Sequence, residues 1–208
     1  KKLWCSDNQL TNLNLSNVPN LAMLRCNDNQ LTQLDLSNVP ELTVLNCGGN
    51  QLLDLDLSNL PQLTELDLSN EPDPETLIFE FDLTELDLSN VPELETLRCN
   101  FHLLTELDLS NVPNLTELSC YFNQLTELDL SNVPNLINVD CSNNKLTDLD
   151  LSNVPNLTFF AFGGNQLTAL DLSRLPELTE LNCSDNQMTD LNLSNVPNLA
   201  MLRCNDNQ

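Results

Sequence analysis

Residues 125–145 read LTELDLSNVPNLINVDCSNNK, and the spacing of their apolar residues decides the fold. Leu125, Leu128 and Leu130 form an L-x-x-L-x-L pattern, and the second half repeats this spacing with Val and Cys in the last two places. L-x-L alternation is typical of a short β-strand, and neither half has the length or the periodicity of a helix. Pro134 separates the halves and stops either strand from continuing. The segment therefore predicts a flattened coil of two short strands.

The spacing of the cysteines shows that this coil recurs along the chain. They are Cys5, Cys26, Cys47, Cys99, Cys120, Cys141, Cys183 and Cys204. All intervals are multiples of 21 residues except one of 52, which equals two periods and ten further residues. Two coils therefore lack the cysteine, which is replaced by Leu68 and Phe162, and one coil carries an insertion, whose extra residues fall within EPDPETLIFEFD.

A fixed period of this size indicates a solenoid, in which each coil buries its apolar face by stacking on its neighbours. We predict a single solenoid over residues 1–208 with an inserted loop at about 71–82. It is expected to hold about nine and a half coils, each with two strands stacked in parallel on those of the next coil. At about 4.8 Å per strand, its length is roughly 45 Å.

Two further segments resemble a known family. Residues 104–124, LTELDLSNVPNLTELSCYFNQ, and residues 31–51, LTQLDLSNVPELTVLNCGGNQ, are similar to leucine-rich repeats of the short, 21-residue bacterial class sometimes called IRREKO-type. The resemblance implies a right-handed, mostly β solenoid with little or no helix. It also implies binding of other macromolecules, often by secreted proteins or on the surface of bacteria. The Asn of the signature would bond neighbouring backbone groups inside each turn, and one coil departs from it with His102.

The cysteine column is expected to point inward with the leucines and to form a ladder of small buried side chains. Disulfides between successive coils are not expected, because strands in register hold Cβ atoms about 4.8 Å apart, beyond the usual 3.5 to 4.5 Å or so. The chain also has no C-x-x-C pair that would indicate a zinc site.

The first half of each coil, called here the LDL half after its recurring LDL sequence, has outward positions that form two acidic columns. The first is Asp35, Asp56, Asp87, Asp108, Asp129, Asp150 and Asp171, and the second, two residues earlier, includes Glu85, Glu106 and Glu127. Stacked on one sheet face, these like charges would repel by roughly 1 kcal/mol per neighbouring pair even in water.

Two interpretations of the columns stay open. They form either a solvated face screened by salt, or a surface that binds divalent cations or a basic partner. Calcium prefers a cage of about six to eight oxygens, which a flat row of carboxylates does not supply. We therefore expect weak, multiple calcium binding at most, and no other cofactor.

A third candidate site lies where the repeat is irregular. The turn after the cysteine carries Phe101, His102, Tyr121 and Phe122, and the insertion contributes Phe79 and Phe81. Phe101 and Phe122 are one period apart and are expected to stack. The aromatic residues form either a small core that holds the insertion down or an exposed binding patch with the loop as its rim. His102 is better explained as a substituted turn residue than as a ligand or a base, because the chain has no second histidine to pair with it.

Charge and composition exclude several functions. The chain has 31 acidic against 7 basic residues, a net charge of −24, which disfavours nucleic acid and anionic membrane surfaces. No apolar run approaches the roughly 20 residues of a membrane-spanning helix, so membrane insertion is not expected. The recurring serines have no neighbouring histidine, and the four glycines occupy turn sites, so no active site is predicted.

These observations predict a non-catalytic protein–protein recognition or adhesion module, placed by the resemblance outside the cell or on a bacterial cell surface. An alternative comes from residues 183–208, which repeat residues 5–30 with 24 of 26 positions identical. The chain is then a segment of a longer array, or a structural protein that stacks end to end into a filament or stalk.

Overall fold

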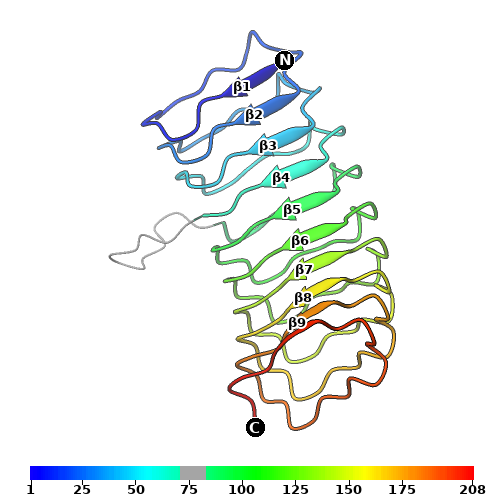
Figure 1. The fold of residues 1–208 in the computed structure, drawn as a ribbon. Helices are drawn as coiled ribbons and strands as arrows, with labels where there is room; N and C mark the ends of the chain where they lie inside the picture. The colour runs from blue at the N-terminus through cyan, green and yellow to red at the C-terminus, as the bar shows by residue number, and fades with distance from the viewer. Residues whose placement is uncertain (71–82) are drawn as a thin grey trace.

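The computed structural model describes residues 1–70 and 83–208, and these residues form one parallel β-solenoid (Figure 1). Its strands are β1 (Lys2–Trp4), β2 (Met23–Arg25), β3 (Val44–Asn46), β4 (Glu65–Asp67), β5 (Thr96–Arg98), β6 (Glu117–Ser119), β7 (Asn138–Asp140), β8 (Phe159–Ala161), β9 (Glu180–Asn182) and β10 (Met201–Arg203). They pair in chain order as a single ten-stranded sheet. The predicted solenoid is confirmed, and no helix occurs in the described ranges, so none there is long and apolar enough to cross a membrane.

The middle residue of each strand sets the register. Leu3 pairs with Leu24 and Leu24 with Leu45, so that identical side chains stack one coil above another. Leu24 and Leu45 are fully buried, while the residues on either side of them point outward. The insertion does not disturb this order, because Leu66 still pairs with Leu97. Burial of a leucine stabilises the fold by about 1.5–3 kcal/mol, so a shift that turned this column outward would be strongly disfavoured.

The prediction of two strands per coil is wrong for the LDL half, which forms no strand among the described residues. Two local features explain this. The Asp35 carboxylate accepts the N–H of Ser37 at 3.0 Å, which starts a turn immediately after the leucines. The coil continues through two short turns, with Val39 N–H donating to Leu36 C=O and Leu42 N–H to Val39 C=O. The L-x-L pattern gave the direction of the side chains correctly but not the pairing of the backbone.

An asparagine ladder closes the turn that follows most of the strands. Asn50 Nδ2 donates to the carbonyls of Cys47 (3.0 Å) in its own coil and Cys26 (2.9 Å) in the preceding coil. Its Oδ1 accepts the N–H of Leu31 at 3.0 Å. Because these backbone groups are buried, the side chain supplies partners that would otherwise be missing. The role that the resemblance implies for this asparagine is confirmed.

Candidate functional site

The aromatic edge is formed by Phe101, Tyr121 and Phe122, in the turns after β5 and β6. Phe101 and Phe122 stack with their ring centroids 4.7 Å apart and their planes at 10°, as predicted, and Tyr121 meets Phe101 edge-on at 5.0 Å. Both phenylalanines have a positive φ, of 58° and 53°, at the site where Gly49 and Gly164 stand in other coils. That conformation costs a bulky residue about 1–2 kcal/mol, which ring stacking worth about 0.5–1.5 kcal/mol partly offsets.

Exposure differs within the aromatic edge. Phe122 is 44% exposed, whereas Phe101 and Tyr121 are half-buried. The other predicted members of this site, Phe79 and Phe81, lie outside the described residues. A binding role for the edge therefore stays a prediction, as does the alternative of a small core around the insertion.

His102 occupies the asparagine position and makes two of the hydrogen bonds that the asparagine makes in other coils. Its Nε2 lies 3.0 Å from the carbonyl of Leu68, and the N–H of Leu83 donates to its Nδ1 at 3.3 Å. Because Nδ1 accepts, Nε2 carries the proton and donates to Leu68. The imidazole thus copies the donor and acceptor of Asn50. With only 5% of its surface exposed, His102 is a turn residue and not part of a contact surface, which corrects its inclusion in the binding patch.

Burial lowers the pKa of His102 from its ordinary value, and the hydrogen bond to the Leu68 carbonyl opposes this effect only in part. The side chain is therefore neutral at neutral pH. Asn70 Nδ2 also lies 3.2 Å from Nδ1, so the two residues that flank the insertion, Asn70 and Leu83, both contact the same ring nitrogen. His102 therefore ties together the two ends of the inserted segment.

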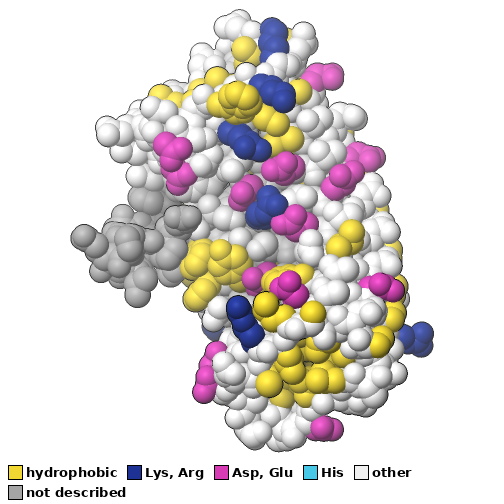
Figure 2. Space-filling view, viewed as in Figure 1, with side chains coloured by type: hydrophobic (Ala, Val, Ile, Leu, Met, Phe, Trp, Pro, Cys, Tyr) yellow, Lys and Arg dark blue, Asp and Glu magenta, His cyan; other side chains and the backbone are white. Residues whose placement is uncertain are grey.

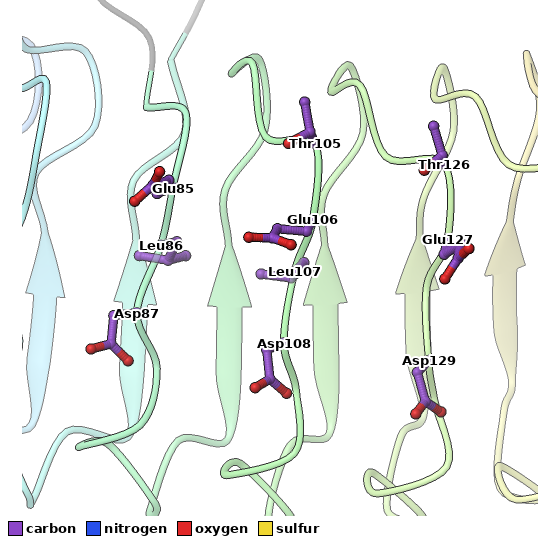
Figure 3. Close-up of a pocket in the computed structure, with 10 residues that line it drawn as sticks. All are labelled: Glu85, Leu86, Asp87, Thr105, Glu106, Leu107, Asp108, Thr126, Glu127 and Asp129. Atoms are coloured by element: carbon purple, nitrogen blue, oxygen red, sulfur yellow. The ribbon is translucent and has the colours of Figure 1, made fainter.

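The acidic face consists of the two carboxylate columns predicted from the LDL half. It lies on the opposite side of the coils from the strands, which corrects its assignment to a sheet face: in Figure 3 the strands pass behind the segments that carry the labelled carboxylates. The three coils that carry β5, β6 and β7 form an open groove of about 590 Å³ there. It is lined by Glu85, Leu86, Asp87, Thr105, Glu106, Leu107, Asp108, Thr126, Glu127 and Asp129.

Local hydrogen bonds stabilise the charge of this face. Hydrogen bonds from the Ser37 hydroxyl and N–H lower the pKa of Asp35, and repulsion from Asp56 raises it by less. The same pattern lowers the pKa of Asp129 through Ser131. Within the described ranges no three His, Cys, Asp or Glu side chains gather as a metal site would require. Weak calcium binding by the columns stays a prediction.

The cysteine column points inward, and all eight thiols are free. Burial raises the pKa of Cys26 and of Cys99 to about 12 and that of Cys183 to about 11. Thiols in this state are protonated and unreactive at neutral pH. The column therefore fills the core rather than forming a reactive site.

The sheet face is the set of outward side chains on the ten strands, and sequence reasoning missed it as a candidate site. In chain order these side chains are Lys2, Trp4, Met23, Arg25, Val44, Asn46, Glu65, Asp67, Thr96, Arg98, Glu117, Ser119, Asn138, Asp140, Phe159, Ala161, Glu180, Asn182, Met201 and Arg203. Near the middle, Arg98 pairs with Glu117 at 2.7 Å and lies 3.9 Å from Glu65. One feature of the sequence could have revealed this face. The residues at these positions differ from coil to coil, whereas the LDLSNVP sequence hardly changes.

Comparisons with known proteins agree with this geometry. A family model described as "Leucine Rich repeats (2 copies)" matches residues 113–153. The functional domain of InlJ from Listeria monocytogenes superposes with a TM-score of 0.91 at 39% identity, over 98% of this chain and 43% of the InlJ chain. The chain is a leucine-rich-repeat protein.

Other leucine-rich-repeat structures are similar over the same length. The internalin InlF of L. monocytogenes matches with a TM-score of 0.65 and 27% identity, over the whole of this chain and 74% of its own. A chain of the Toll–Spatzle complex of Drosophila matches with a TM-score of 0.77 and 25% identity, over the whole of this chain and 30% of its own. The InlJ domain is described as including a cysteine ladder, which parallels the cysteine column of this leucine-rich-repeat chain. No curated protein sequence gives a significant match.

Proposed function

We propose that this leucine-rich-repeat chain is a non-catalytic protein-recognition module that binds its partner with the sheet face. The observation that carries the proposal is the contrast between the two sides of each coil. The LDLSNVP half repeats almost unchanged, whereas the outward strand residues range from Trp4 and Arg25 to Glu65 and Phe159. A face that serves only solubility or regular stacking has no need for such variety, whereas a recognition face does.

The chemistry of the described residues supports a non-catalytic role. His102, the one histidine of the chain, has both ring nitrogens bonded inside a turn. Burial raises the pKa of the inward thiols such as Cys99 and Cys120. The histidine and the buried thiols are therefore committed to the scaffold and do not serve as a base or a nucleophile.

The relatives support recognition of a protein and suggest a location. A chain of the Toll–Spatzle complex, in which Toll is associated with Spatzle, matches this chain over its whole length. The likeness to InlJ and InlF accords with the location that the repeat class implies, which is secretion or attachment to the surface of a bacterium. Adhesion is the biological role that we propose for such a module.

A matched pair of double variants tests which face binds. Glu117→Lys with Glu180→Lys changes the sheet face, and Glu106→Lys with Glu127→Lys changes the acidic face by the same total charge. Partners captured by the wild-type chain from a library of displayed protein domains are then measured against both variants. We expect the sheet-face variant to lose them and the acidic-face variant to retain them. Equal loss in both, or loss in the acidic-face variant alone, would contradict the proposal.

End-to-end self-association is the second candidate, and the internal repetition of residues 5–30 at 183–208 favours it. Light scattering over a range of protein concentrations, with and without millimolar calcium, separates it from recognition of another protein. A constant monomer mass supports the recognition module. Growth of the mass with concentration supports stacking, and growth only with calcium makes the acidic face the joint.

A further inference from the structure

The N-terminal end of the sheet face combines basic and apolar side chains. This basic–apolar patch consists of Lys2, Trp4, Met23, Arg25 and Val44 on β1–β3. The strand register places Lys2, Met23 and Val44 in one row across the strands, and Trp4 beside Arg25 in the next. No outward residue of these three strands is acidic, whereas β4, β6, β7 and β9 each carry an outward carboxylate. Figure 2 shows basic and hydrophobic side chains close together at this end, with acidic side chains at the margins of the view and around the basic ones near its middle.

The patch has a fixed apolar centre. The Trp4 indole N–H donates to the Met23 sulfur at 3.3 Å, which holds the ring across the first two strands. The Trp4 side chain is nevertheless 69% exposed, and Arg25 beside it is exposed as well. An exposed aromatic ring next to an arginine is the kind of anchor that dominates binding energy at protein interfaces.

Charge selects the partner. The chain as a whole has a net charge of −24 and repels acidic partners over most of its surface. Farther along the sheet face, Arg98 is already paired with Glu117 and close to Glu65, which leaves little positive potential there. Lys2 and Arg25 have no carboxylate beside them on their own strands or on β3. The end of the sheet is therefore the part of this face that attracts negative charge.

We propose that the basic–apolar patch binds an acidic segment of a protein partner, with carboxylates on Lys2 and Arg25 and an apolar side chain against Trp4 and Met23. This inference rests on the proposed function, because it names the class of partner that one part of the sheet face selects.

The chain contains its own control for this site. Met201 and Arg203 on β10 repeat the Met–Arg pair of β2 within the duplicated segment. Their neighbours on β9 differ, because Met201 pairs with Glu180 and Arg203 with Asn182, where β2 has Lys2 and Trp4. The second pair lacks both the aromatic anchor and the acid-free surroundings, so we expect it to bind the same segment much more weakly.

The test uses a displayed library of random twelve-residue peptides, selected on the wild-type chain. Selected peptides are expected to be acidic and to contain Leu, Phe or Trp, and their affinity is expected to fall as salt rises from about 50 to 300 mM. By fluorescence anisotropy, Arg25→Glu and Trp4→Ser should each weaken binding by about tenfold or more. Arg203→Glu makes the same charge change and should weaken it by less than about twofold.

Two results would overturn the inference: selection of neutral or basic peptides, or equal effects of Arg25→Glu and Arg203→Glu. Arg25→Glu carries the test alone if circular dichroism shows that Trp4→Ser disturbs the first coil. Failure of this inference alone can be told apart from failure of the proposed function. If partner binding responds to Glu117→Lys with Glu180→Lys but not to Arg25→Glu, the sheet face still recognises a partner and only the acidic class is wrong.

Discussion

Replacing His102 with alanine tests the structural role assigned to the single histidine. The change removes the donor to the Leu68 carbonyl and the acceptor of the Leu83 N–H, at 3.0 and 3.3 Å. Both residues lie in the core, and a buried backbone group that loses its partner destabilises a protein by about 1–3 kcal/mol. We therefore expect His102→Ala, which leaves two such groups without a partner, to lower the free energy of unfolding by about 2–6 kcal/mol. His102→Asn restores the asparagine of the other coils and should stay within about 1 kcal/mol of wild type.

The same residue makes stability depend on pH. Burial lowers the pKa of His102 in the folded state, while the unfolded chain keeps the ordinary value near 6.5. Between these two values the unfolded chain binds more protons, so stability rises with pH. The contribution of His102 is therefore complete above about pH 6.5, and it falls as the pH is lowered toward the folded-state pKa. His102→Asn has no group that titrates there and should lack this dependence.

Urea unfolding followed by circular dichroism from pH 8 to pH 5 measures both effects. Asn123→Ala is the matched control, because Asn123 makes the standard bonds to Cys99 and Cys120 one coil further along. It should destabilise the chain at least as much as His102→Ala, with no change in the pH profile between 5 and 8. The account of His102 would be refuted by a loss under about 1 kcal/mol in His102→Ala. The account would also be refuted if the stability of His102→Asn depended on pH in the same way as that of wild type.

Three further predictions follow from the turns, the thiols and the carboxylates. Gly48→Ala directs a Cβ into the backbone carbonyl of the next coil, whereas at the equivalent Gly163 the nearest atom is 3.2 Å away. Thermal unfolding should therefore show a loss of about 1–3 kcal/mol for the first and a smaller loss for the second, and equal losses would contradict the packing. Ellman's reagent should label Cys204 and, more slowly, Cys5 in the native chain, and the other six thiols only after denaturation; rapid labelling of all eight at neutral pH would show that the column is not buried. NMR titration should give Asp129 a pKa below its ordinary value in spite of neighbouring carboxylates, because Ser131 donates to it, and a raised value would mean that repulsion dominates. Stabilisation from this bond is present above the ordinary pKa and lost as the pH falls through the folded-state value.

Period and residue type were enough to predict the solenoid, its register and the inward columns. When a leucine recurs every 21 residues, all of its copies can be buried only if the coils stack in register. Leu24 and Leu45 stack in this way. The stacking of Phe101 on Phe122 followed from the same period. The second strand was not predictable from alternation alone, because hydrogen bonding at Asp35 and Ser37 turns the backbone away from a ladder.

The candidate site was predicted less well. The regular columns and the departures from the repeat suggested sites, whereas the positions that vary from coil to coil did not. The acidic columns are regular, yet they lie on the side without strands. His102 is irregular, but an imidazole can present one donor and one acceptor as an amide does, and the sequence does not show that both are used inside the turn. The sheet face has no motif at all, since its positions share only their outward direction.

Hydroxyl-radical footprinting of the chain bound to a captured protein partner tests the central claim most directly. Trp4, Met23 and Phe159 report on the sheet face, and Phe122 and Leu53 report on exposed positions away from the strands. If the sheet face recognises the partner, oxidation of sheet-face residues falls in the complex while that of Phe122 and Leu53 is unchanged. Protection of Phe122 and Leu53 with no change on the strands would contradict the account.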